Sequence, residues 1–311
     1  MFDLSALTDA VASHHRVARL VIAAHDGSSP RETGATMLVW QDGQLGTIGG
    51  GALEYEATLR ARAMLQAGGA RLDRAALGPA LGQCCGGAVT LLTEVYDKTN
   101  LPVAEAGLVT RSIDGRPMPL AVRRAIDRSR AMGIVPAPAL IQGWMVEPVA
   151  RPTRDLWIWG AGHVGRAIVQ TLSPLPDFAI TWVDIAADRF PATIPATVTQ
   201  LTARNPADLV AHAPASAEHL ILTYSHALDL DLCHYLLTHG FFRAGLIGSL
   251  TKWARFRSRL AALGHSSAAI AQIDCPIGDP SLGKHPHAIA IGVAAAVLRQ
   301  HKNASRQENA V

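Results

Sequence analysis

The sequence predicts an α/β protein in which a Rossmann-type parallel-sheet domain follows a smaller mixed α/β domain. Strand-like and helix-like segments alternate regularly in the second half of the chain, as in parallel sheets with right-handed crossovers. A G-x-G-x-x-G motif, Gly160–Gly165, lies directly between the first of these strands and the first helix. The stretch 146–154 contains prolines and has no periodicity, which is typical of an interdomain linker. We therefore expect domains at 1–147 and 153–300 and a disordered polar tail at 301–311.

The first domain is expected to contain three strands and one long helix. The strands are predicted at Arg19–Ala24, Ala35–Trp40 and Ala88–Val95. Gln41-Asp42-Gly43 predicts a hairpin turn after the second of them. Ala52–Gln66 is rich in Ala, Leu, Glu and Arg and has no internal Gly or Pro, which favours a helix. No element is predicted for the mixed stretch that follows residue 110.

The second domain is expected to contain five strands, four helices and one short crossover. The strands are predicted at Leu156–Trp159, Phe178–Asp184, Ala196–Leu201, Leu220–Tyr224 and Ala244–Ile247. The helices are predicted at Val164–Leu172, Asp229–Thr238, Thr251–Ala262 and Pro286–Gln300, and the crossover at Pro206–Ala213. This alternation predicts one parallel sheet.

Composition indicates a soluble globular protein: of 311 residues, 49% are hydrophobic and 17% are charged. No apolar run approaches the roughly 20 residues that span a bilayer, and Met1–Ala12 lacks the features of a secretory signal. We therefore expect a cytoplasmic protein without a membrane segment. The net charge of +3 is small and the arginines are scattered, which argues against nucleic acid as a partner.

The glycine motif is suited to an anionic ligand. Gly160 permits a tight turn, Gly162 lets a phosphate approach the backbone, and Gly165 lets the helix pack on the strand. The amides at the helix N-terminus would then face the anion. Asp184 closes the next strand, 19 residues after Gly165, and this spacing suits a carboxylate that contacts a ribose diol. The alternative is a glycine-rich turn that binds nothing.

A second group of candidates precedes the later helices of this domain. Ser249 is expected to cap the helix that carries Lys252, Arg255 and Arg259, whose spacing places the cations on one face. Ser249 and Lys252 would together help to hold a phosphate; a solvated basic face is the alternative. Cys233 lies among apolar residues of a predicted helix and is expected in the core.

Gln83-Cys84-Cys85 is followed by two glycines in a loop of the first domain. Adjacent thiols on such a loop can ligate a soft metal, carry sulfur or form a vicinal disulfide. Structural zinc is not expected, because the histidines upstream are not at ligand spacing. Two inert buried cysteines are the alternative.

These blocks resemble those of a known family. The segments GSSPRETG (27–34), GTIGGGALE (46–54) and GPALGQCCGG (78–87) are similar to signature blocks of the XdhC family, the accessory proteins that serve molybdenum-cofactor insertion into xanthine dehydrogenase. Gly160–Gly165, GLIGS (245–249) and CPIG (275–278) agree with it. The resemblance covers nearly the whole chain apart from 110–145 and the tail. Ala52 stands where the CoxI-like branch has a cysteine, so Cys84 and Cys85 indicate the xanthine dehydrogenase branch.

The resemblance implies an accessory protein without turnover of its own. It would bind the molybdenum cofactor as cargo, protect it while a cysteine desulfurase supplies a sulfido ligand, and deliver it to apo-xanthine dehydrogenase, as a homo-oligomer. The implied cofactor-binding residues are Gln83, Cys84, Cys85, Gly160, Gly162, Gly165, Asp184, Ser249 and Lys252, with the two cysteines near molybdenum, a thiophilic metal.

Two other functions stay open on the residues alone. One is an NAD(P)-dependent oxidoreductase that uses Gly160–Gly165, Asp184 and a redox thiol at Cys84. No Lys-His or Tyr-Lys pair for hydride transfer follows the motif, which argues against it. The other is a nucleotide-sensing module.

Overall fold

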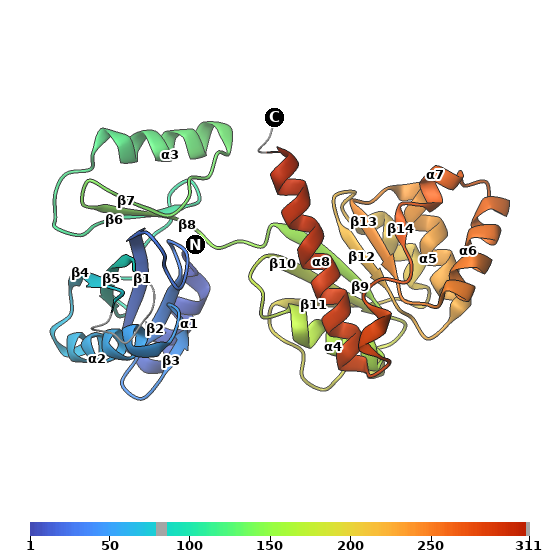
Figure 1. The fold of residues 1–311 in the computed structure, drawn as a ribbon, viewed down its shortest axis with the longest axis horizontal. Helices are drawn as coiled ribbons and strands as arrows, with labels where there is room; N and C mark the ends of the chain where they lie inside the picture. Colours follow the sequence, from blue (N-terminus) through green and yellow to red (C-terminus); the bar gives the residue numbers. More distant parts are fainter. Residues whose placement is uncertain (79–85, 309–311) are drawn as a thin grey trace. The chain divides into compact units, whose positions relative to one another are not determined.

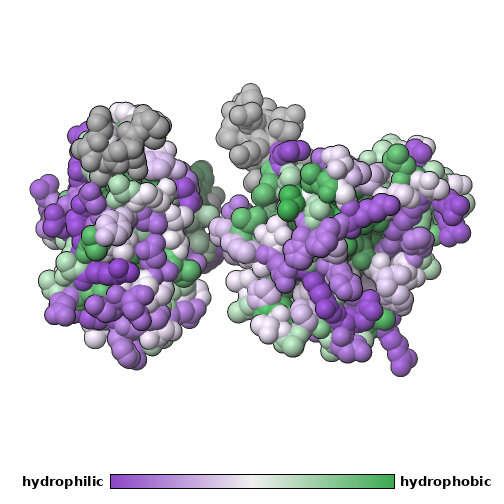
Figure 2. Space-filling model, turned by 60° about the horizontal axis from the view of Figure 1, so that its bottom comes forward, coloured by the Kyte–Doolittle hydropathy of each residue, from purple (hydrophilic) through white to green (hydrophobic). Residues whose placement is uncertain are grey.

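The computed structural model describes residues 1–78 and 86–308, and the chain divides into two compact units, Met1–Ala150 and Arg151–Val311 (Figure 1). Their boundary falls inside the stretch 146–154 that was predicted as the linker. On the face shown in Figure 2, hydrophilic residues cover most of both units and hydrophobic residues occur in small groups. Within the described part of the chain, no helix combines the length and the hydropathy needed to cross a membrane.

The N-terminal unit contains two antiparallel sheets. The larger has the order β3 (Gln44–Gly46), β2 (Thr36–Val39), β1 (Val17–Asp26), β5 (Ala88–Tyr96) and β4 (Ala70–Ala76). The smaller has the order β6 (Leu108–Ser112), β8 (Trp144–Pro148) and β7 (Ala139–Ile141). Three helices accompany them: α1 (Leu4–His14), α2 (Gly51–Ala67) and α3 (Leu120–Met132). The even-numbered side chains of β1 pack with buried residues of α2 such as Leu53 and Ala57.

A buried charge network joins the two sheets of this unit. Arg19 on β1 donates to both carboxylate oxygens of Glu147 on β8, at 3.0 and 2.7 Å. Arg111 on β6 bonds the same Glu147 at 2.6 Å and Glu94 on β5 at 2.8 Å. Two guanidinium groups thus face two carboxylates, which is the arrangement that makes the burial of charge tolerable. The ring of Phe2 lies 3.9 Å from the guanidinium carbon of Arg19 and adds a cation–π contact.

The C-terminal unit is one parallel sheet with helices on both faces. Its order is β11 (Val198–Thr202), β10 (Phe178–Asp184), β9 (Arg154–Trp159), β12 (Glu218–Ile221), β13 (Arg243–Leu246) and β14 (Ile273–Asp274). One face is covered by α4 (His163–Leu172) and α8 (Pro286–Glu308), the other by η3 (Pro206–His212), α5 (His226–His239) and α6 (Leu250–Ala262). Shorter helices are η2 (Ala187–Arg189), α7 (Ser267–Ile270) and η4 (Pro280–Leu282). The strand order reverses between β9 and β12, where open α/β sheets bind ligands.

The predicted fold class is confirmed, with several corrections to its elements. The strand predicted at Leu220–Tyr224 ends at Ile221, because the chain turns there toward α5. The connection between the two units is shorter than the predicted linker, 146–154. That stretch includes the end of β8 and the first residue of β9. The tail predicted as disordered from residue 301 is helical as far as Glu308; it contains no Gly or Pro, so α8 can add one hydrogen bond per residue.

A buried histidine lies in the centre of the parallel sheet. His219 on β12 is almost fully enclosed and accepts a hydrogen bond at Nδ1 from Nε1 of Trp159, at 3.2 Å. Burial, together with the neighbouring His239, lowers the pKa of His219 to about 3. The ring is therefore neutral in the folded protein at neutral and mildly acidic pH.

We predict that His219 makes the C-terminal unit acid-sensitive. Below a pH of about 6.5 the unfolded histidine binds a proton that the folded one does not, so stability falls by up to about 1.4 kcal/mol per pH unit until about pH 3. His219→Gln keeps an acceptor for Trp159 but does not titrate. Urea unfolding should show a smaller loss between pH 7 and pH 5 in this variant than in the wild type. The exposed His212→Gln is the control; an equal loss in all three proteins would contradict the prediction.

Candidate functional site

The candidate site lies at the carboxyl ends of the parallel strands. A cavity of about 340 Å³ is lined by residues from three successive strand-to-helix turns: Val164, Leu222, Thr223, Tyr224, His226, Asp229, Ile247, Gly248, Ser249 and Lys252. A cavity of about 790 Å³ shares Ile247, Gly248 and Ser249 with it and continues to the loops before α8. That larger cavity is lined mainly by apolar side chains. Its lining also includes two charged residues, Asp279 and Lys284. We call the two adjoining cavities the strand-end cleft.

The three glycines of the motif have different roles in the structure. Gly160 has a φ of +123°, and a Cβ there would lie 2.5 Å from the carbonyl oxygen of Leu222. A Cβ on Gly165 would overlap the carbonyl oxygen of Gly160. Gly162 has an ordinary extended conformation (φ −71°, ψ −176°), and a Cβ there would meet no heavy atom within 4 Å. The fold therefore requires glycine at 160 and 165 but not at 162, and open space remains beside the backbone there.

The helix that follows this loop begins without a side-chain cap. Gly162 is the N-cap of α4, and the amides of residues 162–165 have no acceptor among the described residues. By contrast, Ser225 caps α5 by accepting from the Leu228 amide, and Ser249 caps α6 by accepting from the Lys252 amide at 3.1 Å. Ser249 is thus the cap that the sequence predicted. The free amides of α4, with the helix dipole, provide donors for an anion.

Asp184 holds the glycine loop in place. Its Oδ2 accepts from the amide of Ala161 at 2.6 Å and its Oδ1 from the amide of Ile185 at 2.7 Å. Nε of Arg189 lies 3.5 Å from the same carboxylate, which is only 4% exposed. The structure therefore assigns this carboxylate to the loop rather than to the open cleft, where a ribose diol would require it.

Lys252 is bound within the cleft wall. Its Nζ donates to Oδ2 of Asp229 at 2.5 Å and to the carbonyl oxygen of Ile247 at 3.0 Å. Asp229 in turn accepts at Oδ1 from the amide and the hydroxyl of Thr223 at 2.9 and 2.7 Å. The side chains of Asp229 and Lys252 are 1% and 10% exposed. The charge predicted to help hold a phosphate is thus offset by Asp229, a partner that sequence reasoning missed because it lies on another helix.

Gln83, Cys84 and Cys85 lie outside the described residues. On either side of them, the amide of Leu77 donates to the carbonyl oxygen of Gly87 at 2.7 Å. A Cβ on Gly87 would overlap the carbonyl oxygen of Ser28.

The other signature blocks of the N-terminal unit meet at the same place. A Cβ on Gly49 would lie 2.6 Å from Cβ of Pro30. Glu54, another residue that sequence reasoning missed, fixes the intervening turn by accepting from the amides of Ile48 and Gly50 at 2.9 and 3.1 Å. The blocks at 27–34, 46–54 and 86–87 therefore converge in space although they are distant in sequence.

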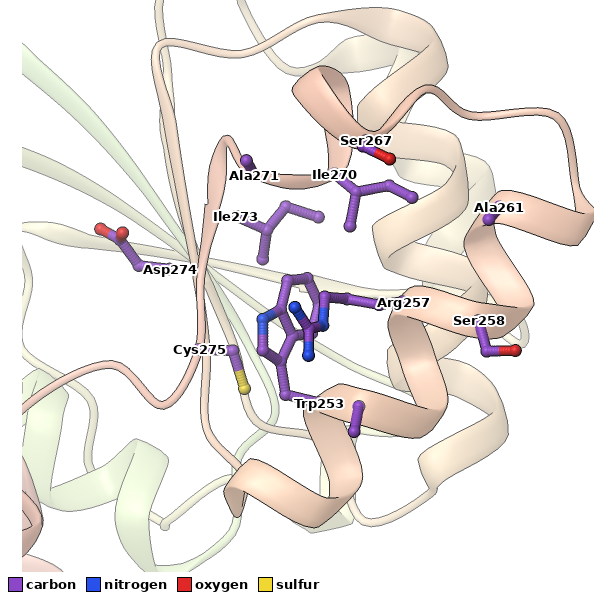
Figure 3. A pocket seen from close by; sticks show the side chains of 11 residues that line it. Trp253, Arg257, Ser258, Ala261, Ser267, Ile270, Ala271, Ile273, Asp274 and Cys275 are labelled. Atoms are coloured by element: carbon purple, nitrogen blue, oxygen red, sulfur yellow. The ribbon is translucent and has the colours of Figure 1, made fainter.

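The two cysteines of the C-terminal unit are not suited to metal binding. Cys233 is buried, as predicted, and burial raises the pKa of its thiol. Cys275 points into a separate cavity of about 650 Å³ beside β14, together with Trp253 (Figure 3), and burial raises the pKa of its thiol to about 11. Both thiols are protonated at neutral pH, whereas metals bind the thiolate. In residues 1–78 and 86–308 no group of three or more His, Cys, Asp or Glu side chains is placed to hold a metal ion.

The C-terminal unit has a Rossmann-type fold with an open glycine loop, and sequence comparison identifies the family of the chain. Residues 156–297 match the XdhC Rossmann domain, and residues 10–75 match the XdhC and CoxI family. The chain belongs to the XdhC family.

Two relatives extend these matches. The chain is 26% identical over 284 residues to the uncharacterized protein YqeB of Escherichia coli K12, covering 89% of this chain and 42% of that protein. It thus spans about two fifths of the length of this curated relative. A crystal structure described as a xanthine dehydrogenase from Bacillus halodurans has the same fold, with a TM-score of 0.70 and 20% identity over 97% of this chain and 96% of that one.

We predict that the pair of Asp229 and Lys252 supports the cleft energetically. Asp229→Asn leaves a buried ammonium without its counter-charge, and the free energy of unfolding should fall by about 3–5 kcal/mol. Adding Lys252→Met should restore part of this loss, because no charge then remains to be buried. The control is Asp231→Asn at an exposed position two residues further along α5. Urea unfolding of the four proteins measures this, and equal stability of Asp229→Asn and the control would rule out the proposed support.

Proposed function

We propose that this protein carries the molybdenum cofactor. It binds the cofactor as cargo in the strand-end cleft, holds it while a cysteine desulfurase supplies a sulfido ligand, and delivers it to apo-xanthine dehydrogenase. The observation that carries the proposal is the opening at Gly162, where the fold tolerates a side chain and the uncapped N-terminus of α4 offers amides to an anion. Membership of the XdhC family directs the choice of cargo.

The cleft is chemically compatible with this cargo. The phosphate group of the cofactor is an anion, and helix N-termini with glycine loops bind phosphate through backbone amides. The larger cavity of about 790 Å³ lies within the usual size range of small-molecule sites. Its apolar floor can contact a ring system, while Ser249, Asp279 and Lys284 supply polar groups at its wall.

The sequence predicts that Cys84 and Cys85, with Gln83 beside them, handle the molybdenum of the cofactor during ligand exchange. A thiolate from either cysteine would shield or hold the metal during ligand exchange. Cys233 and Cys275 do not compete for this role, because burial keeps their thiols protonated. Homo-oligomerisation is part of the proposal and is tested by the mass of the protein in solution.

We predict that Gly162→Val abolishes cargo binding without unfolding the protein. The added side chain occupies the space at which a phosphate would approach the amides, so the affinity for the cofactor should fall at least about tenfold, or about 1.4 kcal/mol, and cofactor content with it. The free energy of unfolding should fall by no more than about 1 kcal/mol, the cost of an apolar residue at an N-cap, because neither φ nor contacts are strained. Mass spectrometry and metal analysis of protein purified from molybdenum-replete cells measure the cargo.

The matched control for this variant is Gly165→Ala, which places a Cβ against the backbone of Gly160 and should destabilise by about 1–3 kcal/mol. A folded Gly162→Val protein with normal cofactor content would show that the cofactor binds elsewhere. Calorimetry with NAD(H) and NADP(H) tests the oxidoreductase alternative. We expect weak binding or none, and tight binding would favour the oxidoreductase.

The second functional prediction concerns the thiol pair. Cys84→Ala with Cys85→Ala removes both candidate thiolates, so activation of apo-xanthine dehydrogenase should be lost while the melting temperature is unchanged. In the wild type, bound cofactor should protect at least one of the two from alkylation. If the double variant carries cofactor and activates the enzyme normally, the thiols have no role in handling the cargo.

A further inference from the structure

Helix α3 and the sheet β6–β8–β7 form a separate layer of the N-terminal unit (Figure 1). This layer lies outside the segments that match the family, 10–75 and 156–297. Val122 and Ile126 of α3 pack on Leu108 and Val146 of the sheet. The apolar stripe of the helix is thereby used within the unit, and its opposite face is exposed to solvent.

The exposed face of α3 carries a net positive charge. The helix contains Arg123, Arg124, Arg128 and Arg130. Arg130 pairs with Glu105 and with Asp127, which is the helix's own carboxylate. The other three arginines are exposed and have no ion pair or side-chain hydrogen bond within residues 1–78 and 86–308. Arg124 and Arg128 lie four residues apart, a spacing at which like charges repel by about 0.2–0.5 kcal/mol.

Apolar side chains accompany these arginines. Leu120 precedes Arg124 by one helical turn and is 60% exposed. At the end of the helix, Met132, Ile134 and Val135 are 68%, 52% and 56% exposed. Protein interfaces are enriched in Arg and Met, and Arg is among the residues that most often contribute large shares of the binding energy. Asp127 is the one carboxylate of α3 and lies one turn from Arg123 and Arg124, but it pairs with Arg130, so the arginines of the helix outnumber its acidic residues by three.

We propose that this face, which consists of Leu120, Arg123, Arg124, Arg128, Met132, Ile134 and Val135, is a docking surface for an acidic patch on a client protein. Given the proposed function, on which the identity of the client rests, that protein is apo-xanthine dehydrogenase. Carboxylates of the client would pair with Arg123, Arg124 and Arg128 and relieve their mutual repulsion. The apolar residues would contribute buried area at the end of the helix.

The observations favour a protein over a membrane or a nucleic acid. A helix that lies in a membrane surface inserts its apolar stripe, whereas Val122 and Ile126 are already buried on the sheet. Binding of single-stranded nucleic acid would call for aromatic side chains beside the cations, and α3 has none.

The test is charge reversal of the three arginines in the full chain. Arg123→Glu, Arg124→Glu and Arg128→Glu together should weaken association with apo-xanthine dehydrogenase at least about tenfold at low salt, mainly through the association rate. The difference from the wild type should shrink as salt is raised. A triple change to Gln, a good helix former, should give an intermediate loss with no change in melting temperature. Surface plasmon resonance with immobilised apoenzyme provides the rates.

The control is Arg255→Glu, Arg257→Glu and Arg259→Glu on α6, which changes the net charge by the same amount at exposed positions. A loss confined to the α3 variants supports the proposal. Equal affinity in wild type and α3 variants, an equal loss in the α6 control, or no association of the wild type with the apoenzyme overturns it. Binding of the wild type to anionic vesicles or to DNA, lost in the α3 variants while apoenzyme binding persists, overturns it as well.

The experiment also separates this inference from the proposed function. Cofactor content is measured on each variant before association, and the α3 variants should retain it, since no residue of α3 lines the cleft. If the wild type carries no molybdenum cofactor but still binds the apoenzyme through α3, the carrier function fails and the docking surface stands. If the wild type carries cofactor but charge reversal on α3 does not change its association with the apoenzyme, the carrier function stands and the docking surface fails.

Discussion

The parallel sheet imposes one requirement on the whole C-terminal unit: each chain turn from strand to helix must satisfy its backbone amides at the same edge. Two of the turns beside the cleft supply side-chain acceptors of their own. Ser225 and Asp229 accept from the amides of Leu228 and Thr223 after β12, and Ser249 accepts from the amide of Lys252 after β13. At the turn after β9, Asp184 satisfies only the amide of Ala161.

Of these three turns, the one after β9 therefore leaves the N-terminus of its helix without a side-chain cap. The Asp229–Lys252 pair ties α5 to α6 and, through the carbonyl oxygen of Ile247, to the end of β13. Asp184 and Nε1 of Trp182, which donates to the carbonyl oxygen of Gly160 at 3.0 Å, fix the first turn of the motif. The donors of α4 are therefore held in position before any ligand arrives, and little ordering is required on binding.

Much of this unit could be predicted from the sequence because its strands are buried on both faces and occur as short continuous apolar runs. Helix α3 was not predicted, since only two of its three buried residues, Val122 and Ile126, are apolar, and the third is Ser129. Strand β4 was not predicted either. It lies at the edge of its sheet and is mostly exposed, so its sequence has no apolar pattern. Asp229 and Lys252 are 23 residues apart, and nothing in their local sequence indicates that they are paired.

The motif itself shows how far sequence reasoning extends. Its spacing predicts a tight turn at Gly160, phosphate approach at Gly162 and helix packing at Gly165. In the structure, backbone oxygens exclude a side chain at the first and third positions, and the second is open. The fold of the strand-to-helix turn thus requires two of the three glycines, Gly160 and Gly165. Only Gly162 is not required by the fold.

This division bears on how a carrier could release its cargo. A phosphate held by backbone amides at a helix end is bound without a dedicated full charge, whereas a buried lysine aimed at it would slow its departure. In the strand-end cleft the charge of Lys252 is offset by Asp229, so the site at α4 depends on amide donors and on the dipole of a helix of 10 residues. Such contacts give selectivity for an anion at moderate affinity. The offset charge is thus compatible with the proposed carrier, which must both hold an anionic cofactor and release it.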